Sequence, residues 1–256
     1  MIDTHAHVNL DAFHEDQRDV LDRAWSAGVT AVVNVGIDRE TSEECCRLAE
    51  SDPRIYATVG QHPNSSAGQE DLSWVRDMAV AHPRVVAIGE TGLDFFRQHA
   101  TQADQEHSFL AHIDMAREFD MPLVVHVRQA EDRVLQILEE MGDQPVRGVW
   151  HCFSGDEGHL GRALNLGLHI GIGGVVTFKN SRLRDIVPLI PGDRLVLETD
   201  CPFLAPHPLR GKRNEPALLT WIRNEIAQAR GDAPEKVDLE TSAAARALFR
   251  LDVVPT

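Results

Sequence analysis

The chain has 256 residues, of which 43% are hydrophobic, and it carries a formal net charge of -15. The apolar fraction excludes a disordered chain, and the length suits one large domain over residues 1–256. The negative charge argues against a broad nucleic-acid-binding surface, because nonspecific affinity for phosphates comes mainly from Lys and Arg. A phosphate could still be bound in a cleft where metal ions and a few local cations supply positive charge.

Short apolar runs alternate with longer segments that have the period of amphipathic helices. Strands are expected at residues 1–7, 31–36, 55–60, 85–90, 123–127, 148–153, 169–173 and 195–200. The helices between them are expected at residues 16–27, 41–51, 72–81, 102–119, 131–141, 158–166 and 182–189. Two further helices, at residues 216–230 and 235–249, follow the last strand.

Strict alternation of strand and helix predicts parallel strands joined by right-handed crossovers. Eight such units close most naturally into a single-domain α/β fold, the (β/α)8 TIM barrel. A doubly wound open sheet is the alternative. The last helix is additional to the barrel and could cover one of its ends. Gly171, Gly173 and Gly174 fit no phosphate-binding motif, and we interpret them as close packing or a tight strand end.

Targeting signals and disulfide patterns are not evident. The first residues lack the regions of a signal peptide, and no apolar run approaches the ~20 residues that span a bilayer. We therefore expect a cytoplasmic protein with no membrane partner, and no obligate protein partner is evident. The four cysteines show no CxxC spacing, so we expect free thiols. They are Cys45, Cys46, Cys152 and Cys201.

Two histidines stand one residue apart at the start of the chain, in Asp3-Thr4-His5-Ala6-His7. Alternate side chains of a strand share a face, so the imidazoles of His5 and His7 would converge. Taken alone, the pair could equally be histidines that are bonded to backbone carbonyls. What decides between these readings lies further along the chain.

Polar residues also stand at the ends of four other predicted strands. They are Glu90, His126, His151 and Asp200. In a barrel the C-terminal ends of the strands meet at one opening, where such folds build their active sites. Each residue alone could be a cap, a turn residue or a satisfied core histidine. Together with His5 and His7 they suit two divalent ions bridged by a carboxylate, and we predict a binuclear metal centre.

Eight segments now carry a family resemblance. In chain order they are MIDTHAH, VGQHP, IGETGLDFFR, VVHVRQA, WHCFSG, GIGGVVTFK, LETDCPFLAP and RGKRNEP. Through them the chain, from residue 1 to about residue 216, resembles the TatD family of metal-dependent deoxyribonucleases, a branch of the amidohydrolase superfamily. The resemblance implies a (β/α)8 barrel. It also implies the ligands: His5, His7 and Asp200 for one ion, His126 and His151 for the other, and Glu90 as the bridge.

The resemblance implies hydrolysis of DNA phosphodiester bonds, including removal of nucleotides from the 3′ end of single strands. Single-stranded DNA or DNA ends would be the substrate. Two divalent ions can share a water and turn it into the nucleophile, so no serine or cysteine nucleophile is needed. Asp200 would accept the proton of that water, and we predict Asp200, Glu90 and His62 as the catalytic residues. Magnesium, manganese and zinc all remain open as the metal.

Two other functions stay open on the sequence. One is an amidase, lactonase or deaminase that uses the same barrel on a small substrate other than nucleic acid. The other is a metal-stabilised protein that binds a partner and catalyses nothing. Both would take up metal, so metal binding does not distinguish them from a nuclease. The substrate that is hydrolysed, or the lack of any, does.

Candidate substrate contacts lie near the predicted centre. His62, in Gly-Gln-His-Pro, could contact a phosphate or act as an acid. Cations would stabilise the charge that builds on nonbridging phosphate oxygens, and five residues could supply them. These are Arg128, Lys179, Arg210, Lys212 and Arg213. Phe95 and Phe96 could stack a base or pack in the core.

The chain departs from the family pattern at a few positions near the presumed substrate. Val127 and Gln129 flank Arg128, where family members often have a serine and an aspartate. Leu209 stands where an aromatic residue or a histidine often precedes RGK, and Asn64 stands where a second histidine is common. The implied ligands are all present, so these departures bear on substrate preference more than on hydrolysis.

Overall fold

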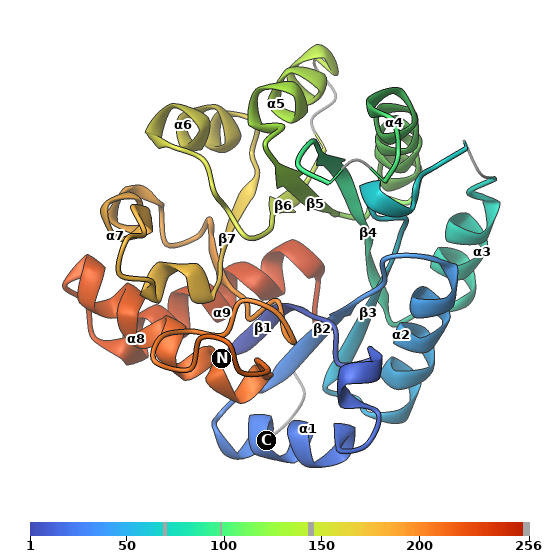
Figure 1. Ribbon diagram of the computed structural model, residues 1–256. Helices are drawn as coiled ribbons and strands as arrows, with labels where there is room; N and C mark the ends of the chain where they lie inside the picture. Colours follow the sequence, from blue (N-terminus) through green and yellow to red (C-terminus); the bar gives the residue numbers. More distant parts are fainter. Residues whose placement is uncertain (69–70, 98, 143–145, 253–256) are drawn as a thin grey trace.

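The computed structural model describes residues 1–68, 71–97, 99–142 and 146–252. Within them, eight parallel strands form one sheet in the order β1 to β8, and helices surround it (Figure 1). The strands are β1 Ile2–Ala6, β2 Ala31–Val35, β3 Ile55–Val59, β4 Val85–Asp94, β5 Leu123–Arg128, β6 Gly148–Trp150, β7 His169–Ile172 and β8 Leu195–Leu197. The helices are α1 Gln17–Ser26, α2 Arg39–Ser51, α3 Ser73–Ala81, α4 Gln102–Glu118, α5 Glu131–Glu140, α6 Glu157–Asn165, α7 Leu183–Ile186, α8 Leu219–Arg230 and α9 Pro234–Phe249.

The sheet closes on itself between β1 and β8. Ala6 pairs with Cys201 in a parallel bridge, and the His7 N–H donates to the Cys201 carbonyl at 2.8 Å. The Asp3 carboxylate adds two bonds across the same seam, accepting from the N–H and the hydroxyl of Thr199 at 2.9 and 2.6 Å. The predicted (β/α)8 barrel is therefore confirmed, and the open-sheet alternative is wrong.

Most predicted elements match the observed ones to within two residues, but β4 is longer than expected. It continues to Asp94 instead of ending at Glu90. The continuation is paired with β5, beyond a register shift that lies between Ile88 and Thr91. An irregularity of this kind inserts an extra residue, bends the strand and redirects a side chain. Glu90 lies inside it.

Strands β6 and β8 are shorter than expected. They end three residues before the predicted ends, at Trp150 and Leu197. The backbone of Cys152 and of Asp200 is left-handed, with φ of 49° and 57°, and a strand cannot continue through that conformation. The predicted helix at 182–189 is also divided, into α7 and a 3-10 turn at Val187–Leu189.

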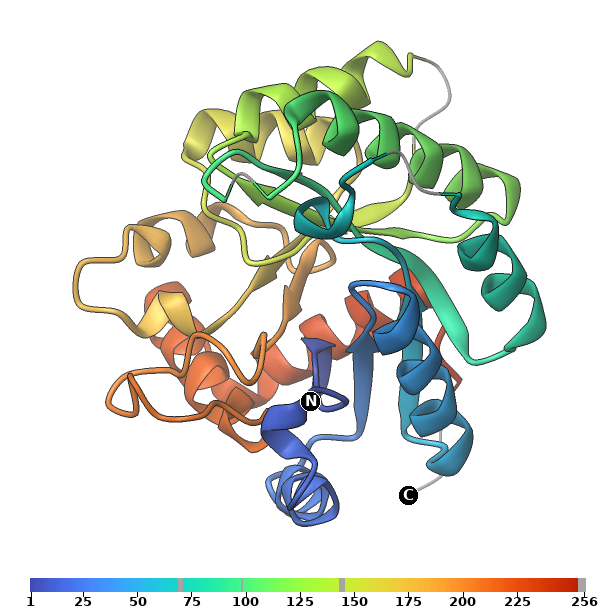
Figure 2. The same ribbon diagram turned by 45° about the vertical axis from the view of Figure 1, so that its right-hand side comes forward.

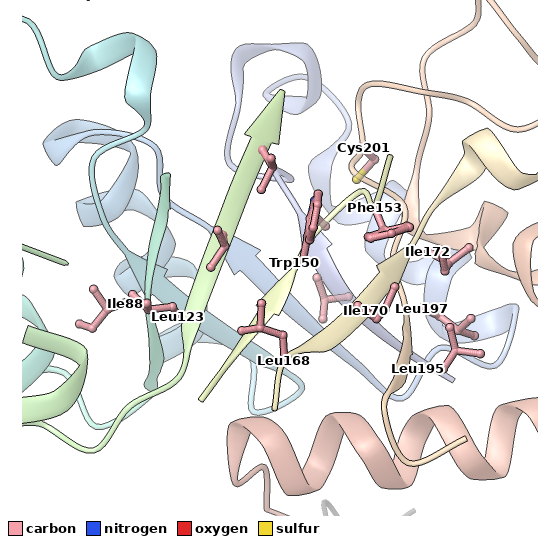
Figure 3. Close-up of a cluster of buried hydrophobic side chains, with 14 of the residues drawn as sticks. Ile88, Leu123, Trp150, Phe153, Leu168, Ile170, Ile172, Leu195, Leu197 and Cys201 are labelled. Atoms are coloured by element: carbon pink, nitrogen blue, oxygen red, sulfur yellow. The ribbon is translucent and has the colours of Figure 1, made fainter. Parts of the chain in front are cut away.

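Both faces of the barrel sheet are buried, as expected for parallel strands. In β5, Leu123 and Val125 belong to the large cluster between sheet and helices, part of which Figure 3 shows. Val124 belongs to a smaller cluster, which α9 completes with Leu248 and Phe249. In Figure 2, α9 runs behind the strands. The last helix therefore covers one barrel end, as predicted.

The structure also bears on the expectations for the cysteines, the three glycines and a membrane span. All four cysteines are free thiols. A Cβ on Gly171 would collide with the Glu198 carboxylate and one on Gly174 with the Leu204 carbonyl, which confirms close packing there, whereas Gly173 has ordinary room. None of the helices in the described ranges combines the length and the apolar character that a membrane crossing requires.

A buried histidine joins α4 to the loop that follows β3. His112 is fully buried; its Nδ1 lies 2.7 Å from the Ser108 carbonyl, and its Nε2 accepts the N–H of Gln61 at 3.0 Å. A carbonyl only accepts, so Nδ1 carries the proton and the ring is neutral. Burial accordingly lowers the pKa of His112 from 6.5 to about 4.

We predict that His112 makes the fold sensitive to acid. The folded pKa lies below the unfolded one, so the stabilisation is complete above pH 6.5 and is lost as the pH falls toward 4. In chelator-treated protein, the free energy of unfolding should fall by about 3 kcal/mol more over this interval in the wild type than in His112→Gln. Urea unfolding at several pH values measures this difference. Parallel pH profiles for the two proteins would contradict the assignment.

Candidate metal centre

His5 in β1 and His7, one residue after the end of β1, converge in the barrel, as the sequence predicts. Their side chains are buried, and their Nε2 atoms lie 3.1 Å apart. His7 Nδ1 lies 2.9 Å from the Val35 carbonyl. Because that carbonyl can only accept, Nδ1 of His7 holds the proton and Nε2 presents its lone pair to the centre. A backbone partner of this kind is typical behind a metal-binding histidine.

The Glu90 carboxylate lies between two groups of imidazoles. Its Oε2 atom is 3.4 Å from His5 Nε2 and 3.8 Å from His7 Nε2. Its Oε1 atom is 2.8 Å from His126 Nδ1 and 3.0 Å from His151 Nε2. Each carboxylate oxygen therefore faces a different pair of histidines, and the residue lies within the register shift of β4.

Asp200 completes the group around β1. Its Oδ1 atom lies 3.5 Å from His7 Nε2 and 3.7 Å from His5 Nε2. The ligand atoms of these three residues are all within 4.8 Å of one another. The Asp200 N–H donates to the His5 carbonyl at 2.8 Å, so the seam that closes the barrel also places this carboxylate.

His62 stands beside the second group. Its Nε2 atom is 3.7 Å from Glu90 Oε1, and its ring lies edge-on to His126, with centroids 4.4 Å apart. His62 Nδ1 accepts the N–H of Asn64 at 3.1 Å, so the neutral ring carries its proton on Nε2. His62 thus presents a donor to the centre, whereas His7 presents an acceptor.

Sequence reasoning missed two buried carboxylates behind these side chains. Asp94 Oδ2 lies 3.5 Å from His126 Nε2. Glu198 accepts a short hydrogen bond from the Cys152 N–H, and its Oε1 atom lies 3.8 Å from His151 Nδ1. Burial raises the pKa of Glu198 to about 8. The available signal was position, since these residues follow Glu90 by four places and precede Asp200 by two.

Burial and nearby charge oppose each other in setting the protonation of the centre. Burial lowers the pKa of His5 to about 4 and that of His62 to about 3. Burial acts on His151 too, but the Glu90 carboxylate outweighs it and raises the pKa of His151 to about 9. Burial disfavours the ionised Glu90 carboxylate, yet the surrounding histidines outweigh that cost and hold its pKa well below 4.5.

The residues present fit a divalent metal ion. The centre offers imidazole nitrogens and ionised carboxylate oxygens, the donors that zinc, manganese and related ions accept. The buried Nδ1 of His5 has no hydrogen-bond partner among the described residues, which leaves its tautomer free to follow a ligand bound at Nε2. The protein can therefore hold metal at the mouth of the barrel.

Two of the predicted phosphate contacts are stacked on aromatic rings. The Arg128 guanidinium lies 4.1 Å from the ring centroid of Phe96, and the Arg210 guanidinium lies 4.1 Å from that of Phe178. These distances are typical of cation–π pairs. Arg128 ends β5, two residues after His126, so its stack lies beside the second group of imidazoles.

The other predicted substrate contacts are less closely tied to the centre. Arg213 is bonded to the Asp16 carboxylate at 2.6 and 2.8 Å, a structural pairing that sequence reasoning did not foresee. Lys179 and Lys212 are exposed. Their phosphate contacts remain predictions. Phe95 is half-buried and packs against the large core cluster, which is the apolar role considered for it.

Comparisons with known proteins find similar sequences and structures along nearly the whole chain. The family model described as TatD related DNase matches residues 2–250. A Bacillus subtilis protein named uncharacterized metal-dependent hydrolase YabD is 38% identical and covers 98% of this chain and 100% of its own length. The 3′-5′ ssDNA/RNA exonuclease TatD of Cronobacter sakazakii is 37% identical, with 100% of both chains covered. The crystal structure of the Escherichia coli TatD homologue YJJV superposes with a TM-score of 0.92 at 28% identity, covering 100% of this chain and 98% of the other.

We predict that metal uptake releases protons. Carboxylates near His7, His126 and His151 outweigh burial and raise the pKa of each imidazole, whereas a metal requires the neutral ring. Apparent affinity of metal-stripped protein for Zn²⁺ should therefore rise from pH 6 to pH 8. Calorimetry in buffers of different ionisation enthalpy should report about one proton or more released per chain.

Two histidine variants test whether this uptake belongs to the centre. His126→Ala should take up less metal than the wild type. His107→Ala, which removes an exposed histidine of α4, should behave as the wild type does. A binding enthalpy that is the same in every buffer would contradict proton release, and equal uptake by both variants would place the metal elsewhere.

Proposed function

The chain belongs to the TatD-related DNase family, and from that membership we propose that it is a metal-dependent exonuclease acting on the 3′ ends of single strands. Single-stranded DNA is the proposed substrate, and the names of the curated relatives extend the proposal to RNA. The product would be a 5′-mononucleotide and a strand shortened by one residue with a free 3′-hydroxyl. The phosphodiester bond is broken by water, so no cofactor is consumed.

The observation that carries the proposal is the placement of Glu90. One carboxylate oxygen faces His5 and His7, and the other faces His126 and His151. We assign Glu90 as the bridge between two divalent ions. His5, His7 and Asp200 would hold the first ion, and His126 and His151 the second. Divalent ions held there would supply a hydroxide nucleophile at neutral pH and offset charge on the phosphate.

Asp200 suits the role of proton acceptor. Burial would raise its pKa, but the neighbouring imidazoles of His7, His151 and His5 outweigh burial and lower it. The carboxylate is therefore ionised at neutral pH and can take a proton from the attacking water. It can then return that proton to the leaving 3′-oxygen, so that one group serves both steps.

His62 suits a different role from that of an acid. Its pKa of about 3 keeps the ring neutral, with the proton on Nε2. We assign it as a hydrogen-bond donor to a nonbridging phosphate oxygen, where charge accumulates during attack. Arg128 and Arg210 would add positive charge at the edge of the same site.

A labelled oligonucleotide tests the function directly. Protein loaded with Mg²⁺, Mn²⁺ or Zn²⁺ should shorten a 5′-labelled single strand one nucleotide at a time, and a blocked 3′ end should prevent this. Glu90→Gln should lower kcat by about a thousandfold or more, because the bridging charge is lost. Glu43→Gln, an exposed carboxylate of α2, should match the wild type.

A substrate panel separates this function from its alternatives. A small cyclic amide should be hydrolysed far more slowly than the oligonucleotide. Preference for the amide would favour an amidohydrolase acting on small substrates. Metal uptake without turnover of any substrate would contradict the nuclease proposal and would favour a protein that binds a partner and catalyses nothing.

A further inference from the structure

Two phenylalanines beside the metal centre leave about half of their side chains in solvent. Phe96 is 54% exposed and Phe203 is 53% exposed. A single exposed apolar residue needs no explanation. These two, however, follow buried or partly buried carboxylates of the centre at similar spacing: Phe96 is two residues after Asp94, and Phe203 is three residues after Asp200. Both exposed rings therefore stand close in sequence to carboxylates of the centre.

Phe203 is held in place beside the first group of ligands. Its N–H donates to the Asp200 carbonyl at 2.9 Å, and its carbonyl accepts from the Asn214 side chain at 2.7 Å. Asn214 is fully buried and also donates to the Thr199 carbonyl at 2.8 Å. The Phe203 ring lies 6.1 Å from the His7 ring, at 70° to it. Hydrogen bonds thus hold the backbone of this loop, and the Phe203 ring lies next to a proposed ligand.

Phe96 is held in a matching way beside the second group. Its N–H donates to Asp94 Oδ1 at 2.9 Å, while Asp94 Oδ2 lies 3.5 Å from His126 Nε2. The Arg128 guanidinium stacks on the Phe96 ring at 4.1 Å. One carboxylate therefore contacts both a proposed ligand and the backbone of an exposed aromatic residue. A cation suited to phosphate lies over the ring of that residue.

We propose that Phe203 and Phe96 stack the bases of the two nucleotides joined by the bond that is cut, one base on each ring. This inference rests on the proposed function and names the groups of the substrate that the site recognises. Every base has an aromatic face, so the contacts tolerate any sequence. A chain with a net charge of -15 gains little from general attraction to phosphates, which makes stacking an important source of affinity.

Abasic substrates test the proposal in the metal-loaded enzyme. Three single strands are compared: one natural, one with an abasic last nucleotide and one with an abasic penultimate nucleotide. In the wild type each missing base should lower kcat/KM by about tenfold, the effect expected for one stacked base. Phe203→Ala should remove the discrimination at one of these positions, and Phe96→Ala should remove it at the other.

Matched variants separate stacking from damage to the fold. Phe203→Tyr keeps the ring and should keep the discrimination. Trp221→Ala removes a ring that is 47% exposed on α8 and should leave both discriminations unchanged. Metal content and Tm of the alanine variants should equal those of the wild type, because neither residue is a proposed ligand.

The outcomes distinguish this proposal from the function on which it rests. If the wild type shortens all three strands at equal rates, or if both alanine variants keep the normal discrimination, base stacking is refuted and the nuclease function stands. If both variants lose discrimination at the same position, the assignment of one base to each ring is refuted. A wild type that shortens none of the strands overturns the proposed function, and this inference with it.

Discussion

An ionised carboxylate buried among imidazoles is the constraint on which the rest of this structure depends. Glu90 is 3% exposed, and an isolated charge at that depth would be far too costly to keep. Histidines from three different strands or strand ends surround it, namely His5, His126 and His151, and they hold its pKa low. A ring of groups that are distant in sequence can meet only where parallel strands end together, which is what a closed barrel provides.

The two ends of the barrel differ in how their residues contribute to stability. At one end α9 buries Leu248 and Phe249 against apolar side chains inside the barrel. At the mouth, in contrast, some residues have an unfavourable backbone conformation. The backbone of Cys152 and of Asp200 lies in the left-handed region there. Backbone in that region costs roughly 1–3 kcal/mol for a residue other than glycine, and it persists only when the surrounding packing enforces it. Apolar burial at the covered end and around the sheet offsets that cost.

The sequence predicted those features of the structure that local sequence patterns determine. The expected alternation at the end of β1 agrees with the convergence of His5 and His7. Polar residues near the expected strand ends, Glu90, His126, His151 and Asp200, also converge, although Glu90 lies within β4 and not at its end. The same patterns could not find the extension of β4 to Asp94, because it depends on pairing with β5. Nor could they foresee that Arg213 would be bonded to Asp16, 197 residues away in sequence. Both depend on tertiary contacts that no local pattern records.

The charge of the chain also bears on how a polyanion would be held. A protein with a net charge of -15 gains little from general attraction to phosphates, so productive binding must be concentrated where metal ions and a few cations act together. The guanidinium groups of Arg128 and Arg210 each lie over an aromatic ring, which restrains the side chain and reduces the entropy lost when it binds phosphate. Binding concentrated in this way suits the capture of a few nucleotides at a strand end. It suits coating a duplex less well, because that requires an extended basic surface, and a net charge of -15 argues against one.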